Sequence, residues 1–167
     1  MENDEYRVEL VGHYLTKLRL EDEIQTYFSG RNILVTGGAG AIGSNLVVAL
    51  SELVGSDGMI IVLDNLSAIK SNDPIDFPSL SNVMFVNGDV RSDVDLKRVF
   101  RERPTIIYHL AAFFANQNSV DYPENSVDVD INGIIKLLDL AQFTNVERFV
   151  YASSGCAIYG SYGTMPL

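Results

Sequence analysis

The chain has 167 residues and a formal net charge of −10 at pH 7, which fits one domain with its own hydrophobic core. The acidic balance argues against general binding to nucleic acid or to a membrane surface, because both need a basic face. One cysteine and two histidines, His13 and His109, exclude an internal disulfide and are too few for a metal motif. The acidic N-terminus does not resemble a secretory signal, and no apolar run approaches the ~18 residues of a membrane-spanning helix, so we expect a cytoplasmic protein.

Residues 1–30 precede the regular part of the pattern and are predicted to form an amphipathic helical extension. Apolar side chains recur at helical spacing over residues 8–28, and Gly30 can end that helix. Two interpretations stay open for this segment. It packs on the edge of the domain, or it contacts a partner subunit or another domain.

From Arg31 onward, apolar strands alternate with helical patterns, and a polar stretch at 67–82 reads as a loop. The predicted strands are 32–36, 59–64, 83–87, 105–110 and 148–153, and the predicted helices are 42–53, 92–103 and 123–143. Such alternation predicts an α/β fold, a doubly wound parallel sheet of the Rossmann type with strand order 3-2-1-4-5 and helices on both faces.

The most informative motif lies between the first strand and the next helix. Gly37, Gly40 and Gly43 match G-x-x-G-x-x-G, and the turn they permit lets bare backbone approach a pyrophosphate at a helix N-terminus. A glycine-rich turn without a ligand is the alternative. Asp64, however, ends the next strand 21 positions after Gly43, near the spacing of a ribose-binding carboxylate. The pair predicts a dinucleotide site, and Asp64 followed by Asn65 favours NAD, because the carboxylate would repel a 2′-phosphate.

Taken together, the motifs resemble the extended short-chain dehydrogenase/reductases, and within them the NAD-dependent nucleotide-sugar epimerase/dehydratase group. The resemblance covers residues 32–160. It rests on residues 36–43, 62–67, 88–91, 109–112, 132–133, 151–154 and 158–160 in this order.

This resemblance implies roles for individual residues in NAD binding. The pyrophosphate loop and the start of its helix correspond to Gly37, Gly40, Ala41, Ile42 and Gly43. Asp64 with Asn65 corresponds to the position that binds the adenosine ribose, and Asp89 and Val90 to the pair that flanks the adenine ring. The small residues at the end of the fourth strand correspond to Leu110, Ala111 and Ala112. A helix asparagine that braces the active-site strand corresponds to Asn132. Two alternatives stay open: Asp89 can be a turn residue at the end of a strand, and Asn132 can be an ordinary solvated residue of a helix. His109 lies inside the fourth strand and is expected to be structural.

The catalytic residues are predicted only in part. Ser154 matches the family's serine or threonine that binds the reacting sugar hydroxyl, and Ser153 is its rival because the stretch 155–157 makes the register uncertain. The family's Tyr-x-x-x-Lys pair is absent, and the last lysine is Lys136. We therefore expect residues 31–167 to be an incomplete NAD-binding domain, truncated before the catalytic helix and the substrate lobe, and inactive alone.

The resemblance implies NAD-dependent epimerisation of a nucleotide sugar by transient hydride transfer in the complete enzyme. In the dehydratases of this group, an Asp-Glu pair directly follows the serine or threonine and supplies the acid and base that eliminate water. Gly155, Cys156 and Ala157 follow Ser154 here, which disfavours a dehydratase. A reductase or dehydrogenase of the same superfamily and a non-catalytic NAD-binding module are the alternatives. The expected partners are the nucleotide-sugar substrate and a second copy of the chain in a homo-oligomer, as a dimer.

Overall fold

The computed structural model describes residues 2–17, 22–68, 80–113 and 116–154. Most of the loop expected at 67–82, and everything after Ser154, therefore lies outside the described residues. The strands are β1 (Asn32–Thr36), β2 (Met59–Asp64), β3 (Val83–Asn87), β4 (Ile106–His109) and β5 (Arg148–Tyr151). The helices are α1 (Glu2–Lys17), α2 (Asp22–Phe28), α3 (Ala41–Val54), α4 (Asp93–Phe100), α5 (Asn116–Asp121), α6 (Pro123–Ser126), the π-helix η1 (Val127–Asn132) and α7 (Gly133–Gln142).

The five strands form one parallel sheet of order β3-β2-β1-β4-β5, which confirms the predicted doubly wound topology. At the centre of the sheet, Leu34 of β1 is in register with Ile61 of β2 and Ile107 of β4. All three side chains are fully buried, as expected for strands covered on both faces. Because the strands are parallel, their carboxyl ends meet at one edge, where open α/β sheets bind ligands.

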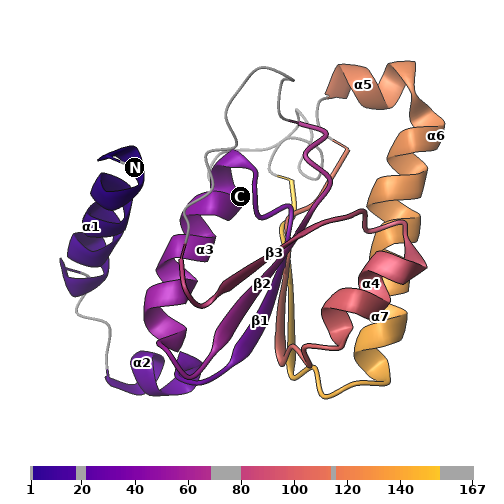
Figure 1. The fold of residues 1–167 in the computed structure, drawn as a ribbon. Coiled ribbons are helices and arrows are strands. Elements are labelled where there is room, and N and C mark those ends of the chain that lie inside the picture. The colour runs from indigo at the N-terminus through magenta and orange to yellow at the C-terminus, as the bar shows by residue number, and fades with distance from the viewer. Residues whose placement is uncertain (1, 18–21, 69–79, 114–115, 155–167) are drawn as a thin grey trace, which may run out of the picture.

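Helices cover the two faces of the sheet in separate layers (Figure 1). On one face, Ile33, Val35 and Val62 pack against Val47 and Leu50 of α3. On the other face, the alternate residues of the same strands pack against Leu96 and Val99 of α4 and Leu137 of α7. Both clusters are made mostly of aliphatic side chains, so each face of the sheet has its own hydrophobic core.

The N-terminal extension is helical, as predicted, and the structure gives it two helices, α1 and α2. Residues 18–21 between them lie outside the described part of the chain. α1 lies beyond α3, away from the sheet (Figure 1), and α2 also contacts α3. Tyr27 and Phe28 of α2 pack against the core on the α3 side of the sheet.

Several element boundaries differ from the prediction. α4 begins at its Ser92 cap as expected but ends at Phe100 rather than at 103, because the chain turns there and Arg103 takes a left-handed φ of 51°. β4 ends at His109 and β5 at Tyr151, each before its predicted end. Helix α5 was not predicted, because its polar sequence has no apolar period.

The helix predicted at 123–143 is divided into α6, η1 and α7. Within it, the N–H of Gly133 donates to the carbonyl of Asp128, five residues back, which is the π-helical pattern. The extra residue in that turn changes which side chains face the sheet. Among the described residues, no helix combines the length and the apolar character needed to cross a membrane.

Candidate functional site

The glycine turn after β1 is packed so closely that side chains cannot enter it. Gly37 has a φ of 71°, and a Cβ there would lie 2.6 Å from the backbone nitrogen of Ala111. A Cβ at Gly43 would overlap the carbonyl oxygen of Gly37. The N–H of Gly37 also donates to the carbonyl of Leu63 over 2.9 Å, which holds the turn against β2. The motif therefore makes the strand–turn–helix geometry that its spacing predicted.

α3 begins directly after this turn, with Gly40 at its N-cap. Ala41 and Ile42 are exposed, whereas Gly43 is buried against the turn. No acidic residue lies in the first turn of α3. The first N–H groups of a helix have no partner inside it and carry partial positive charge, so the end of α3 can receive an anion.

Asp64 connects the glycine turn to the loop after β2. Its Oδ2 accepts a hydrogen bond of 2.9 Å from the N–H of Ala39, and its Oδ1 accepts one of 2.8 Å from the N–H of Leu66. These two bonds fix the carboxylate at the carboxyl end of the sheet. A carboxylate has about four acceptor positions, so Asp64 can still accept from two ribose hydroxyls.

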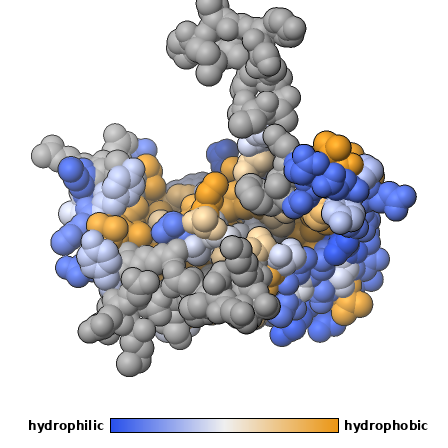
Figure 2. Space-filling view, turned by 90° about the horizontal axis from the view of Figure 1, so that it is seen from above, coloured by the Kyte–Doolittle hydropathy of each residue, from blue (hydrophilic) through white to orange (hydrophobic). Residues whose placement is uncertain are grey.

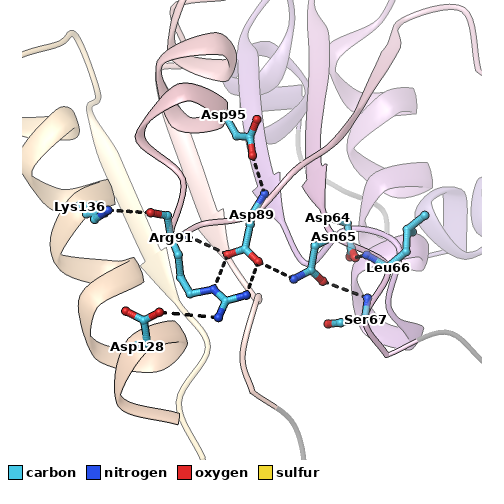
Figure 3. A network of polar contacts seen from close by, with 9 residues as sticks. All are labelled: Asp64, Asn65, Leu66, Ser67, Asp89, Arg91, Asp95, Asp128 and Lys136. Carbon is cyan, nitrogen blue, oxygen red and sulfur yellow. Dashed lines mark hydrogen bonds and ion pairs between the residues drawn. The ribbon is translucent and has the colours of Figure 1, made fainter. Parts of the chain in front are cut away.

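Asp89, two residues after the end of β3, is the centre of a polar network (Figure 3). Its Oδ1 accepts from the backbone N–H and from Nε of Arg91, at 2.9 and 3.0 Å. Its Oδ2 accepts from Nη2 of Arg91 and from Nδ2 of Asn65, both at 2.8 Å. The hydrogen bonds from Arg91 lower the pKa of Asp89 to about 2, so its carboxylate is ionised at neutral pH.

The partners of Asp89 are themselves held in place. The Oδ1 of Asn65 accepts from the N–H of Ser67 at 3.0 Å, and Nη1 of Arg91 lies 3.6 Å from Asp128 of η1. Val90 is only 5 % exposed and its side chain belongs to the core against α4 and α7. Only the backbone of Val90 can therefore act in the adenine role that the resemblance implies.

His109, the last residue of β4, is buried and paired with Thr36. Its Nδ1 lies 2.6 Å from the hydroxyl of Thr36, and that hydroxyl accepts from the N–H of Ala111 at 3.3 Å. His109 is 1 % exposed, and burial lowers its pKa to about 4, so the ring is neutral at pH 7. Its Nε2 has no hydrogen-bond partner among the described residues. These contacts support the structural role expected for His109.

Of the remaining predicted residues, those at 110–112 follow β4 and the two serines follow β5. Leu110 and Ala111 are partly buried, and Ala112 is exposed. Ser153 and Ser154 are exposed just beyond β5, where the N–H of Ala152 still donates to the carbonyl of His109. Asn132 is exposed and donates to Asp128 at 3.1 Å. From above, hydrophobic residues lie in the middle of this end of the molecule, between two mostly hydrophilic flanks (Figure 2).

Sequence reasoning assigned no role to Thr36, Arg91 or Asp130. Thr36 supports the end of β4, and Asp130 accepts from the N–H of Phe113 at 2.7 Å, which fixes the chain after that strand. Arg91 belongs to the motif at residues 88–91, and its place two residues after Asp89 could have indicated its role. The sequence contains no such indication for Asp130, because the direction of its side chain depends on the π-helical turn of η1. Within the described part of the chain, no group of three or more His, Cys, Asp or Glu residues could hold a metal ion.

The sheet order, the glycine turn before α3 and the acid at the end of β2 define an α/β domain of the Rossmann type. Residues 33–167 match the model of the NAD dependent epimerase/dehydratase family. The chain belongs to that family.

Individual relatives agree with this assignment. A putative UDP-glucose 4-epimerase of Methanocaldococcus jannaschii is 36 % identical over 136 residues, which cover 81 % of this chain and 42 % of the relative. The structure of epimerase Mth375 from Methanothermobacter thermautotrophicus is similar, with a TM-score of 0.78, 49 % identity and coverage of 87 % and 41 %. The UDP-glucose 4-epimerase of Thermus thermophilus, solved with NAD, is 38 % identical with a TM-score of 0.63 and coverage of 80 % and 41 %. The chain thus spans about two fifths of the length of these relatives.

Proposed function

We propose that this chain binds NAD and is the cofactor-binding part of an enzyme that epimerises a nucleotide sugar. The observation that carries the proposal is the position of the Asp64 carboxylate, hydrogen-bonded to Ala39 within the glycine turn. That contact brings a ribose-binding acid next to a pyrophosphate-binding turn, as NAD requires. The name UDP-glucose 4-epimerase, which two of these relatives carry, supports the substrate class.

In this proposal each part of the cofactor has its own set of residues. Gly37, Gly40 and the first N–H groups of α3, at Ala41, Ile42 and Gly43, hold the pyrophosphate, and Asp64 with Asn65 binds the adenosine ribose. Asp89 and the backbone of Val90 bind the adenine ring. Leu110, Ala111 and Ala112 leave room near the nicotinamide end, and Asn132 braces the active-site strand.

When bound, NAD supplies the acceptor and donor of hydride that transient oxidation of a sugar carbon needs. The chain's own part in that chemistry is to orient the substrate. A hydroxyl of Ser154, or of its rival Ser153, hydrogen-bonds the reacting sugar hydroxyl beyond β5. A tyrosine needs a lowered pKa to remove the hydroxyl proton, and this chain has no Tyr-x-x-x-Lys pair to provide one. We therefore expect binding of NAD with little turnover.

The proposal is tested by calorimetric titration of NAD and NADP into the wild type and the D64N variant. Asp64 offers charge-assisted hydrogen bonds to two hydroxyls, so D64N should weaken NAD binding by roughly 10- to 100-fold and should narrow the preference for NAD over NADP. D57N, in the exposed turn after α3, is the matched control and should bind as the wild type does. Absence of NAD binding by the wild type, or a preference for NADP, would overturn the proposal.

A further inference from the structure

The carboxylate of Asp89 uses its whole acceptor capacity inside the protein. A carboxylate has about four acceptor positions. Arg91 takes three of them, through its backbone N–H, Nε and Nη2, and Nδ2 of Asn65 takes the last one, on Oδ2. A purine amine can therefore reach Asp89 only by replacing one of these donors.

Arg91 is the donor that is hardest to replace. Its guanidinium binds Asp89 through two nitrogens, and such charge-assisted bidentate pairs are roughly twice as strong as neutral hydrogen bonds. The residue is also held from η1 and α7, because Asp128 lies 3.6 Å from its Nη1 and Lys136 donates to its carbonyl at 2.6 Å. Lys136 in turn pairs with Asp93 of α4 at 2.8 Å.

Asn65 is held much less firmly. It is an exposed residue of the loop after β2, and it offers Asp89 a single N–H of a neutral amide. The bond from Ser67 to its Oδ1 orients that amide but does not tie it to another element of the fold. Exchange of the Asn65 N–H for the N–H of a ligand replaces one neutral donor by another, which costs little free energy.

We propose that Arg91 is the positioning residue that fixes Asp89 for base recognition, and that Asn65 holds the one acceptor position that an adenine amine takes in exchange. This inference rests on the proposed NAD site and extends it to the selection of the base. Arg91 acts through Asp89 and does not itself touch the ligand. Asn65 acts as an internal competitor of the amine.

The test compares NAD with nicotinamide hypoxanthine dinucleotide, in which a carbonyl oxygen replaces the adenine amine. The two dinucleotides differ only at this edge of the base, where hypoxanthine also carries a proton on ring N1, so the ratio of their dissociation constants reports on recognition of that edge. The wild type should prefer NAD by about tenfold, because the carbonyl oxygen would face a carboxylate. R91M should lower this ratio to below about threefold, and R91K should give an intermediate ratio, since lysine offers no planar pair of N–H donors.

Two further variants separate the two parts of the inference. N65A removes the competing amide and should keep or raise the preference for NAD, even if both dinucleotides bind more weakly. R98M makes the same chemical change as R91M at an exposed position of α4 and should leave the ratio unchanged. Circular dichroism establishes that each variant is folded, and R91K provides the answer if R91M is not.

The outcomes distinguish this inference from the function on which it rests. An unchanged ratio in folded R91M and R91K would overturn the positioning role of Arg91. A fall of the ratio in N65A to the level of R91M would overturn the exchange at Asn65. If the wild type binds both dinucleotides equally, only the inference fails, whereas if it binds neither, the proposed NAD site fails first.

Discussion

At the scale of single residues, the buried imidazole of His109 should make stability depend on pH. Burial lowers its pKa to about 4 in the folded chain, whereas an unfolded histidine titrates near ~6.5. Between these values the unfolded state binds more protons, so the free energy of unfolding rises with pH. The contribution is complete above about pH 6.5 and falls by at most about 3 kcal/mol as the pH drops to about 4.

Urea unfolding measured between about pH 4 and 7 tests this expectation. H109N removes the titrating group and should flatten the pH dependence over that range. H13N, on α1, is the control and should follow the wild type, because His13 is exposed. A pH dependence that survives in H109N would assign it to other groups.

The geometry around single residues could be predicted where the chain itself encodes it. The turn needs glycine at Gly37 and Gly43 for local steric reasons, and Asp64 follows at a fixed spacing, so the sequence displays all three. The partner of Thr36 is His109, which lies 73 residues away. No local pattern predicts such a pair, because only the parallel register of β1 and β4 brings the two residues together.

At the scale of elements, α2 is bound to the beginning of β5 through Tyr27. Nε of Arg148 donates to the Tyr27 hydroxyl at 2.9 Å, and the guanidinium of Arg31 lies 4.4 Å from the centre of the Tyr27 ring. Arg31 also pairs with Glu147 at 2.7 Å. These contacts connect the N-terminal extension to the last described strand and lie at the end of the sheet opposite the glycine turn.

Replacement of Tyr27 by leucine should therefore destabilise the domain without changing the NAD site. Y27L keeps apolar bulk but removes the hydroxyl and most of the cation–π attraction, which together contribute about 1–2 kcal/mol. Y14L, at an α1 side chain that is 61 % exposed, is the matched control and should stay within about 0.5 kcal/mol. Urea denaturation gives both values. Equal effects of the two substitutions would show that the Tyr27 contacts do not stabilise the fold.

The helix after β4 illustrates what an element-level prediction cannot include. The sequence favours a helix across residues 123–143, but it does not indicate the π-helical turn at η1. That turn nevertheless directs Asp128 toward Arg91 and Asp130 toward Phe113, so part of the site depends on it.

At the scale of the whole molecule, the topology was predictable because each part of the pattern agrees with the rest. Apolar strands alternate with amphipathic helices, and right-handed parallel connections then leave few possible strand orders. The observed order β3-β2-β1-β4-β5 is one of these. The same pattern does not predict which outer surfaces of the helices stay in contact with water, because that depends on whether another protein covers them.

One such surface runs along η1 and α7. Val127, Ile131, Ile135 and Leu138 are spaced by four, four and three positions and are each 45–51 % exposed. Leu137 and Ala141, on the other side of α7, are buried in the core. A stripe of half-exposed aliphatic residues on a helix is typical of a surface that another protein covers. We expect a second copy of the chain to cover it, as in the predicted homodimer.

Light scattering over a dilution series tests this expectation. The wild type should associate reversibly, and I131E should shift the distribution toward the monomer. In a two-fold symmetric interface each substitution occurs twice, so the variant places unpaired carboxylates on both partners in an apolar contact. V94E, at a side chain that is 77 % exposed on α4, should leave association unchanged. A monomeric wild type, or equal association of I131E and the wild type, would show that this stripe is not an interface between copies.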